Sequence, residues 1–573
     1  MSAPWQRWSR PWALLTSALL SVLLGVQTRA HPPTPPTHGP ERRPAAAPTY
    51  PVAALTPALR QGATSVVRCH KVQLTLEQPD RYTYTVRRVV TILTPAAAAE
   101  AQLVVRSSSL QKITDLDARL YDAAGQPGRR LRAATDWRDV SATTAGTFLD
   151  DSRARVADAR QATYPYTVEL TYTVTSANPL YLPDWQPQQV WDQSVEHATF
   201  HLRHPAALPV RWRERFLPAG AARPDTSTAG LTVHRWVVRH LLALPDVAFA
   251  PPLAEQAAAV WCAPTAFSVQ GYAGRQGTWA EFGQWYHHLN AGRDELPAAL
   301  LAEMAALRDS VPDLRRRAQR VYERVQRSTR YVSIQFGLGG WQTMAAAEVA
   351  RTGYGDCKAL TTYTRALLSG AGLPAYPALV QAGAEAPDLH ADWVAPQFNH
   401  VILCVPLAGA APRKAAGKEA GRADTVWLEC TSATQPFGAL GDFTANRRVL
   451  LITPGGGSIV RTPALDATTT HRARHIAVRL DATGGATATV RTRRTGPLGD
   501  DYAQLLPLTG ADQQRVISQS LRSPSPVTLV RARLVARPAT TAGAVVLEEL
   551  DLTLAAAAAR AGTRLRLPLN LLS

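Results

Sequence analysis

The stretch Gly353-Tyr354-Gly355-Asp356-Cys357-Lys358 (GYGDCK, residues 353–358) and the segment after it decide the fold of the central part of the chain. Its two glycines allow a tight turn. Residues 358–369 (KALTTYTRALLS) then place apolar side chains at helical spacing, and Gly370 and Gly372 follow, as they do at helix C-termini. Cys357 is therefore predicted at the start of a helix, with Asp356 in the capping position. There the helix dipole, the unpaired backbone N–H groups and the charge of Lys358 favour a thiolate, so Cys357 is the candidate nucleophile rather than a buried structural cysteine.

A thiol nucleophile needs a base, which can come from a distant part of the sequence. Asn399-His400 opens an apolar predicted strand, residues 401–407 (VILCVPL). A histidine at the edge of a buried strand is held rigidly while one ring nitrogen stays accessible. His400 is the favoured base, and His390, in a polar loop, is the alternative.

The base in turn needs an acid that orients its ring and stabilises its charged form. Glu429 lies in the next predicted strand, residues 425–430 (TVWLEC). A carboxylate within such an apolar strand is costly unless it is paired, and His400 on the adjacent strand would supply the partner. The alternative is a glutamate that faces water from an edge strand.

The order of cysteine at a helix start, histidine on a strand and acid on the next strand resembles the transglutaminase-like superfamily of papain-like thiol enzymes. The resemblance covers roughly residues 280–435, and its matching stretches are Gly355-Asp356-Cys357-Lys358, Asn399-His400-Val401, Trp427-Leu428-Glu429-Cys430-Thr431 and residues 331–341 (YVSIQFGLGGW). The family commonly has aspartate where this chain has Glu429. Glutamate can still accept the imidazole N–H, and Asp392 is the alternative acid.

The resemblance implies a mechanism of thiol-dependent acyl transfer or hydrolysis. Cys357 would attack an amide carbonyl of a protein or peptide, with His400 as its ion-pair partner, and form a thioester that passes its acyl group to water or to an amine. The backbone N–H of Cys357 would be one oxyanion donor, and the side chain of Gln335 or Trp341 a second. No metal and no cofactor is assigned. The alternative hypothesis is a catalytically degenerate scaffold that acts as a cell-envelope binding protein.

Outside the central core the patterns are mostly those of β-strands. Period-two alternation predicts strands over 81–93, 167–174, 198–202, 210–216 and 231–238, and again over 475–480, 486–494, 527–535 and 544–554. Helical periodicity over 279–289, 297–308 and 312–328 introduces the core. At roughly 100–200 residues per domain, 573 residues exceed one compact domain.

The prediction is therefore a multidomain α+β protein. Its parts are a signal peptide, residues 1–30; a Pro-rich linker, 31–64; an antiparallel β-sandwich domain, 65–250, which looks like an uncharacterised module of exported bacterial proteins; a papain-like, transglutaminase-like α+β core, 260–460; and a β-rich C-terminal domain, 470–573.

The first thirty residues predict the destination of the protein. Arg7 and Arg10 precede an apolar run over 12–26, and small residues follow up to Ala30, which is the layout of a secretory signal. The run is short for a membrane span, so an exported protein, periplasmic or secreted, without an integral membrane domain is expected. The net charge of +18 is spread along the chain without a nucleic-acid-binding motif. A protein or peptide substrate, possibly a cell-envelope peptide, is therefore the expected partner, and nucleic acid is not.

Overall fold

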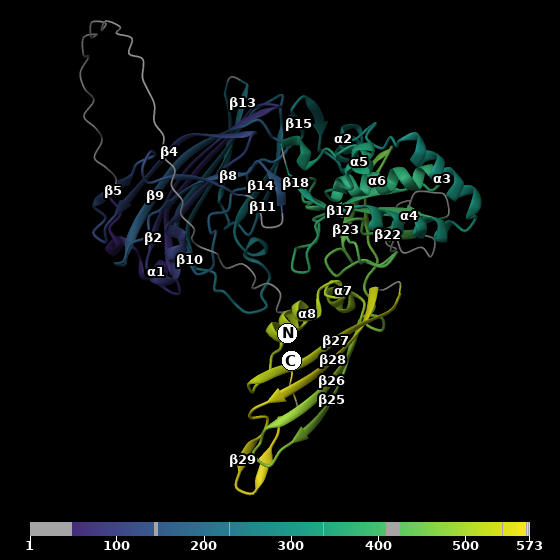
Figure 1. The fold of residues 1–573 in the computed structure, drawn as a ribbon. Coiled ribbons are helices and arrows are strands. Elements are labelled where there is room, and N and C mark those ends of the chain that lie inside the picture. Colours follow the sequence, from purple (N-terminus) through teal and green to yellow (C-terminus); the bar gives the residue numbers. More distant parts are fainter. Residues whose placement is uncertain are drawn as a thin grey trace, which may run out of the picture.

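The computed structural model describes residues 49–142, 147–228, 230–335, 337–407, 425–540, 543–568, 570 and 572. The predicted signal peptide and residues 31–48 of the predicted linker lie outside this part of the chain. Three parts follow one another in sequence: a large β region, a mixed helical and β region, and a β-sheet that projects away from both (Figure 1).

The N-terminal part is built on one eight-stranded sheet. Its strands, in spatial order, are β12 (Ala222–Thr228), β13 (Leu231–Leu241), β10 (Gln193–Pro205), β1 (Ser65–Gln78), β2 (Arg81–Ile92), β9 (Tyr166–Ser176), β4 (Gln111–Tyr121) and β5 (Pro127–Leu131). A smaller sheet shares its apolar core and consists of β3 (Gln102–Ser107), β8 (Arg153–Asp158) and β6 (Arg138–Ser141). The alternating apolar residues of β1 and β2 point into this core, as the sequence pattern predicts.

Two predictions for this part need correction. The sandwich is not purely antiparallel, because β1 and β10 pair in parallel, from Ser65 opposite Gln193 onward. The predicted linker reaches residue 64, whereas short helices η2 (Val52–Ala54) and α1 (Pro57–Arg60) already pack on the sheet through Val52 and Leu59. Both features depend on partners distant in sequence, which a local pattern does not encode.

The central part combines helices with a five-stranded antiparallel sheet. The helices are α2 (Trp279–Leu289), α3 (Ala298–Ser310), α4 (Leu314–Ser328), α5 (Ala346–Thr352) and α6 (Cys357–Gly370). The sheet has the order β22 (Thr425–Leu428), β21 (His400–Pro406), β20 (Tyr376–Val380), β23 (Arg448–Thr453) and β24 (Gly456–Arg461). Helix α6 is buried along most of its length and packs through Leu360 and Leu367 in one core with Leu403 of β21 and Leu428 of β22. This packing brings the start of the helix close to one end of β21.

Short strands and loops join the N-terminal and central parts. β11 (Val210–Arg215) pairs with β14 (Ala259–Pro264), and β15 (Ala266–Val269) pairs with β16 (Tyr272–Arg275). β18 (Ser333–Gln335) pairs in parallel with β7 (Thr147–Asp150), which belongs to the N-terminal part. The two parts are therefore connected by backbone hydrogen bonds as well as by side chains.

The C-terminal part is a four-stranded antiparallel sheet in the order β25 (Arg472–Leu480), β26 (Ala486–Thr495), β28 (Gly543–Leu554) and β27 (Val527–Thr540). Helices α7 (Pro497–Ala503) and α8 (Gly510–Ser520) pack on it, and the pair β29 (Ala559–Ala561) and β30 (Arg564–Arg566) extends its far end (Figure 1). Across the described ranges, no helix combines the length and the apolar character that a bilayer crossing requires. The chain as a whole is multidomain and rich in β-structure.

Candidate active site

Cys357 is the first residue of α6, and the sequence around it fixes the start of this helix. Helix α5 ends at Thr352 and is followed by Gly353, whose φ of 70° lies in the left-handed region that glycine adopts without strain. The chain then forms the short strand β19 (Tyr354–Gly355) and enters α6, where the Asp356 carboxylate accepts the backbone N–H of Ala359 at 2.9 Å. The predicted cap is thus present, and Cys357 lies where the first helical N–H groups have no partner within the helix.

Asp356 has a second contact, an ion pair with the ammonium group of Lys358. Both side chains are about 5% exposed, so this is a buried pair directly beside the thiol. A buried charge is stable only when it is paired, and each of these two residues therefore depends on the other.

His400 is the first residue of β21 and lies opposite Val380 of β20. It lines the same cavity as Cys357, and the volume of this cavity is about 180 Å³. The cysteine at the helix start and the histidine at the strand edge therefore meet in one accessible space, although they are far apart in sequence.

Glu429 follows the last residue of β22 and is completely buried. Its Oε2 accepts a hydrogen bond from Nε2 of His400 at 2.8 Å. Its Oε1 accepts from the backbone N–H of Thr431 at 3.0 Å and from the Thr431 hydroxyl at 2.5 Å. The hydroxyl of Tyr322, on α4, lies 2.9 Å from the Glu429 carbonyl oxygen and holds the backbone at this point. Both carboxylate oxygens are thus occupied, and the His400 ring is fixed by a firmly held group.

The charges of His400 and Glu429 stabilise each other. Burial lowers the pKa of His400, but the Glu429 carboxylate and the neighbouring Cys357 raise it more, to about 10. Burial likewise raises the pKa of Glu429, but the charge of His400 and the bonds from His400 and Thr431 lower it below its usual range. At neutral pH the pair is therefore imidazolium and carboxylate, and Nδ1 is the ring nitrogen left to face the thiol.

The two alternative residues lie elsewhere. His390 contacts Glu255 at 3.4 Å and packs against the Trp261 ring, in a different cavity from Cys357. Asp392 forms an ion pair with Arg213 at 3.0 Å, and its side chain is 77% exposed. Of the candidates for base and acid, the structure thus brings His400 and Glu429 to the neighbourhood of Cys357.

The two candidate oxyanion donors are placed differently. Trp341 lines the Cys357 cavity, and its ring centroid lies 6.0 Å from that of Tyr181. Gln335 belongs to β18, and its side chain lies outside the described part of the structure.

The sequence pattern did not identify two further residues of the cavity wall, Asn178 and Tyr181. Both lie in the segment between β9 and β10, far from Cys357 in sequence. The Oδ1 atom of Asn178 is buried and has no hydrogen-bond partner among the described residues. Only the packing of the N-terminal sheet against the core brings this segment to the site.

Comparison with known proteins identifies one region of the chain and one similar overall fold. Residues 78–245 match the model of a domain of unknown function with a solved structure, DUF3857. None of the curated proteins matches the chain. Among solved structures, a candidate protease from Parabacteroides distasonis is 12% identical over 85% of this chain and 93% of its own, with a TM-score of 0.51. An M1 zinc metallopeptidase from Deinococcus radiodurans is 14% identical over 45% of this chain and 56% of its own, but its TM-score of 0.19 is too low to indicate a shared fold. The chain therefore contains a DUF3857-like region and has an overall fold similar to that of the Parabacteroides protein.

Proposed function

We propose that the protein is a cysteine-dependent enzyme of the transglutaminase-like superfamily, with a papain-like core, and that it acts on amide bonds of proteins or peptides. The observation that carries the proposal is the position of His400. Its ring meets Cys357 in one cavity and donates through Nε2 to the buried Glu429 at 2.8 Å. This is the arrangement of nucleophile, base and orienting acid that acyl transfer requires.

In the proposed reaction the Cys357 thiolate attacks the amide carbonyl carbon, and a negative charge develops on the carbonyl oxygen. The C–N bond then breaks as imidazolium His400 gives its proton to the departing amine or ammonia, which leaves a thioester on Sγ. Water or an amine next attacks the thioester and loses a proton to His400, and the C–S bond breaks to restore the thiolate. Hydrolysis is the proposed outcome when water is the acceptor.

The oxyanion of each tetrahedral intermediate needs hydrogen-bond donors, and two are proposed. The backbone N–H of Cys357 is available because α6 begins at this residue. Trp341 lines the same cavity, and its indole N–H is the second proposed donor. Each donor of this kind contributes about 3 kcal/mol in other acyl-transfer enzymes.

Glutamate at position 429 is compatible with the proposed role. Because Glu429 lies just beyond the end of β22, the backbone can accommodate its additional methylene. Its second oxygen is bound by Thr431 and does not compete for His400. The predicted signal peptide supports the further proposal that the enzyme is exported and that its substrate is a periplasmic or extracellular polypeptide.

The test measures hydrolysis of fluorescein-labelled casein by the full-length protein, by Cys357→Ala and by Cys69→Ala. Cys69 is a free cysteine on β1 and serves as the matched control. We expect Cys357→Ala to lose hydrolysis with unchanged circular dichroism, and Cys69→Ala to retain it. Addition of hydroxylamine to the wild type should trap the thioester as a hydroxamate. Equal hydrolysis by wild type and Cys357→Ala would reject the proposal and favour the scaffold hypothesis.

A further inference from the structure

The C-terminal part carries a large share of the positive charge of the chain. Residues 471–573 contain fourteen arginines, no lysine and seven acidic residues, which gives them a net charge of +7 out of the +18 of the whole chain. More than a third of the net charge therefore lies on less than a fifth of the sequence. Two of the seven acids, Asp500 and Glu548, are buried, so the surface of this part is more basic than its composition alone indicates.

Six of these arginines lie on one face of the C-terminal sheet. Helices α7 and α8 lie on the other face, where Ala488, Val490 and Leu550 are buried in the core. The outward face is exposed to solvent, and the sheet projects away from the rest of the protein (Figure 1). The strand register places six exposed arginines on this outward face: Arg479 of β25, Arg491 and Arg493 of β26, and Arg531, Arg533 and Arg537 of β27.

Carboxylates neutralise only part of the outward face. Asp551 forms an ion pair with Arg531 at 2.8 Å. Glu549 lies between Arg491, at 3.3 Å, and Arg533, at 3.8 Å. These are the two acids that the register of β28 places among the six arginines, so the outward face keeps a net charge of +4.

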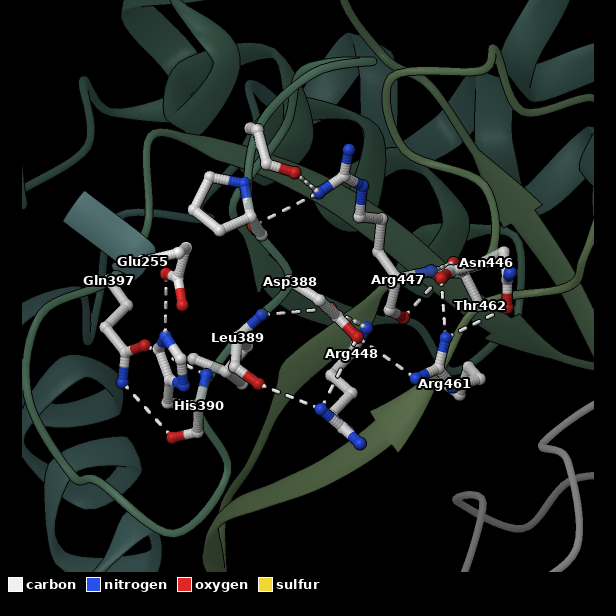
Figure 2. Close-up of polar contacts among 12 residues, drawn as sticks. Glu255, Asp388, Leu389, His390, Gln397, Asn446, Arg447, Arg448, Arg461 and Thr462 are labelled. Carbon is white, nitrogen blue, oxygen red and sulfur yellow. Dashed lines mark hydrogen bonds and ion pairs between the residues drawn. The ribbon is translucent and has the colours of Figure 1, made fainter. Parts of the chain in front are cut away.

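Arginines in the central part of the chain are engaged in the fold. Arg447 is buried and donates to backbone carbonyl oxygens, and Arg461 forms an ion pair with Asp388 at 3.0 Å (Figure 2). On the outward face, by contrast, the side chains of Arg479 and Arg537 are exposed and form neither an ion pair nor a hydrogen bond within the described ranges. Their guanidinium groups are therefore available to an anionic partner.

The far end of the sheet is also basic, and it exposes apolar side chains. Leu480 and Leu567 are 38% and 36% exposed there. Asp481 supplies one negative charge, in the turn that follows β25. The hairpin of β29 and β30, which extends this end (Figure 1), carries three exposed arginines: Arg560, Arg564 and Arg566.

We infer that the outward face and the far end of the C-terminal sheet bind the surface of a membrane that contains anionic phospholipids. A guanidinium group matches a phosphate with two parallel hydrogen bonds. The six arginines are spread over a face about 14 Å wide rather than along one groove, so they fit a layer of headgroups better than a single polymer strand. Exposed leucines beside arginines favour the boundary between headgroups and acyl chains. The inference does not rest on the proposed function, since no residue of this surface lines the Cys357 cavity.

The test measures co-sedimentation of the full-length protein with sucrose-loaded vesicles. One set of vesicles is phosphatidylcholine alone, and the other contains about one-third phosphatidylglycerol. We expect binding to the anionic vesicles only, and loss of this binding when salt is raised from about 0.05 M to about 0.5 M, because salt screens the charges. The triple variant Arg479→Gln, Arg493→Gln and Arg533→Gln should bind about a hundredfold more weakly, since each arginine at an anionic surface contributes about fivefold.

The matched control removes the same charge from α4, through Arg316→Gln, Arg320→Gln and Arg327→Gln. These three arginines are exposed on one helix of the central part, and their replacement should preserve vesicle binding. Equal losses in the two triple variants would overturn the inference, because net charge alone would then explain the binding.

The wild type provides a second decision, which holds even if a variant does not fold. Equal sedimentation with neutral and anionic vesicles, or none with either, would reject the membrane assignment. Binding to soluble polyglutamate without binding to vesicles would also reject it, and would assign the outward face to an acidic polypeptide.

Discussion

Replacement of Glu429 by glutamine tests the electrostatic arrangement around Cys357 most directly. Glutamine has nearly the same shape and can still accept from Thr431, but it removes the negative charge that faces His400. With that charge present, the pKa of His400 is about 10. Without it, burial still lowers the pKa of His400 and only Cys357 still raises it, so the pKa falls back toward its ordinary value of about 6.5.

The size of the expected effect on the Cys357 thiol follows from this fall in the pKa of His400. At about pH 7.5 the wild-type imidazole is almost fully protonated, whereas a group with a pKa of about 6.5 is only about one-tenth protonated. As the pKa of His400 approaches this value, the population of the imidazolium form that faces Cys357 falls by up to about tenfold. We expect the rate of alkylation of Cys357 by iodoacetamide at this pH to fall by the same factor, and hydrolysis to fall further because ring orientation is also lost.

The same pair contributes to stability within a defined pH window. The pKa of His400 is higher in the folded state, so its contribution is complete below about pH 6.5 and disappears as pH rises through about 10. The pKa of Glu429 is lower in the folded state, so its contribution is present above about pH 4.5 and is lost as pH falls through the folded value. Between these limits we expect Glu429→Gln to lower the free energy of unfolding by about 3 kcal/mol, near the lower end for removing one partner of a buried pair.

The assay combines alkylation and unfolding. Iodoacetamide labelling is followed by mass spectrometry across the range from about pH 5 to 10, and urea unfolding is measured near pH 6 and near pH 10. Asp225→Asn is the matched control, since Asp225 contacts His234 at 2.9 Å in the N-terminal sheet, away from the thiol. An alkylation profile of Cys357 that is the same in wild type and Glu429→Gln would refute the reasoning. A decrease in the free energy of unfolding of Glu429→Gln that is as large near pH 10 as near pH 6 would also refute it.

Substitutions at three positions probe the same site. Cys357→Ala should remove the fastest-labelled thiol, so that the remaining cysteines react slowly and alike; rapid residual labelling would contradict this. Asp356→Ala should lower the free energy of unfolding in urea by at least about 3 kcal/mol, because it removes the helix cap and leaves Lys358 buried without its partner. Asp356→Asn should lower it less, because asparagine keeps the cap. Trp341→Phe should slow casein hydrolysis about a hundredfold but leave alkylation of Cys357 nearly unchanged, since alkylation forms no oxyanion; parallel losses in both assays would argue against its role as donor.

Local patterns predicted the elements that carry the site. Apolar spacing after Cys357 placed α6 within one residue of its observed start, and residues 279–289 form α2 as predicted. The contact between Glu429 and His400 followed from a simple argument, namely that a carboxylate in an apolar strand needs a partner. These features could be predicted from the sequence because their causes lie within a few residues or on neighbouring strands.

Other features were not predictable because they depend on distant packing. Alternation in β1 and β10 shows which faces are buried, but it does not show that the two strands are parallel neighbours. Asn178 and Tyr181 lie in a connecting segment without periodicity, and only the three-dimensional arrangement brings them to the cavity of Cys357. The helix α5 was missed since its seven residues show too little periodicity to distinguish it from a loop.

The parallel pairing of β1 with β10 has a consequence for the order of folding. The Gln193 amide donates to the Ser65 hydroxyl, and these residues are 128 positions apart in the sequence. Strand β1 can therefore pair with β2 early, but it cannot pair with β10 until this length of chain has been synthesised. Such long-range pairing is slow, and until it occurs the open strand edge is exposed to wrong partners. Asn178 and Tyr181 lie between β9 and β10 and reach their final places only when the sheet closes. We therefore expect the Cys357 thiol to gain its full enclosure late in folding, after this long-range pairing is complete.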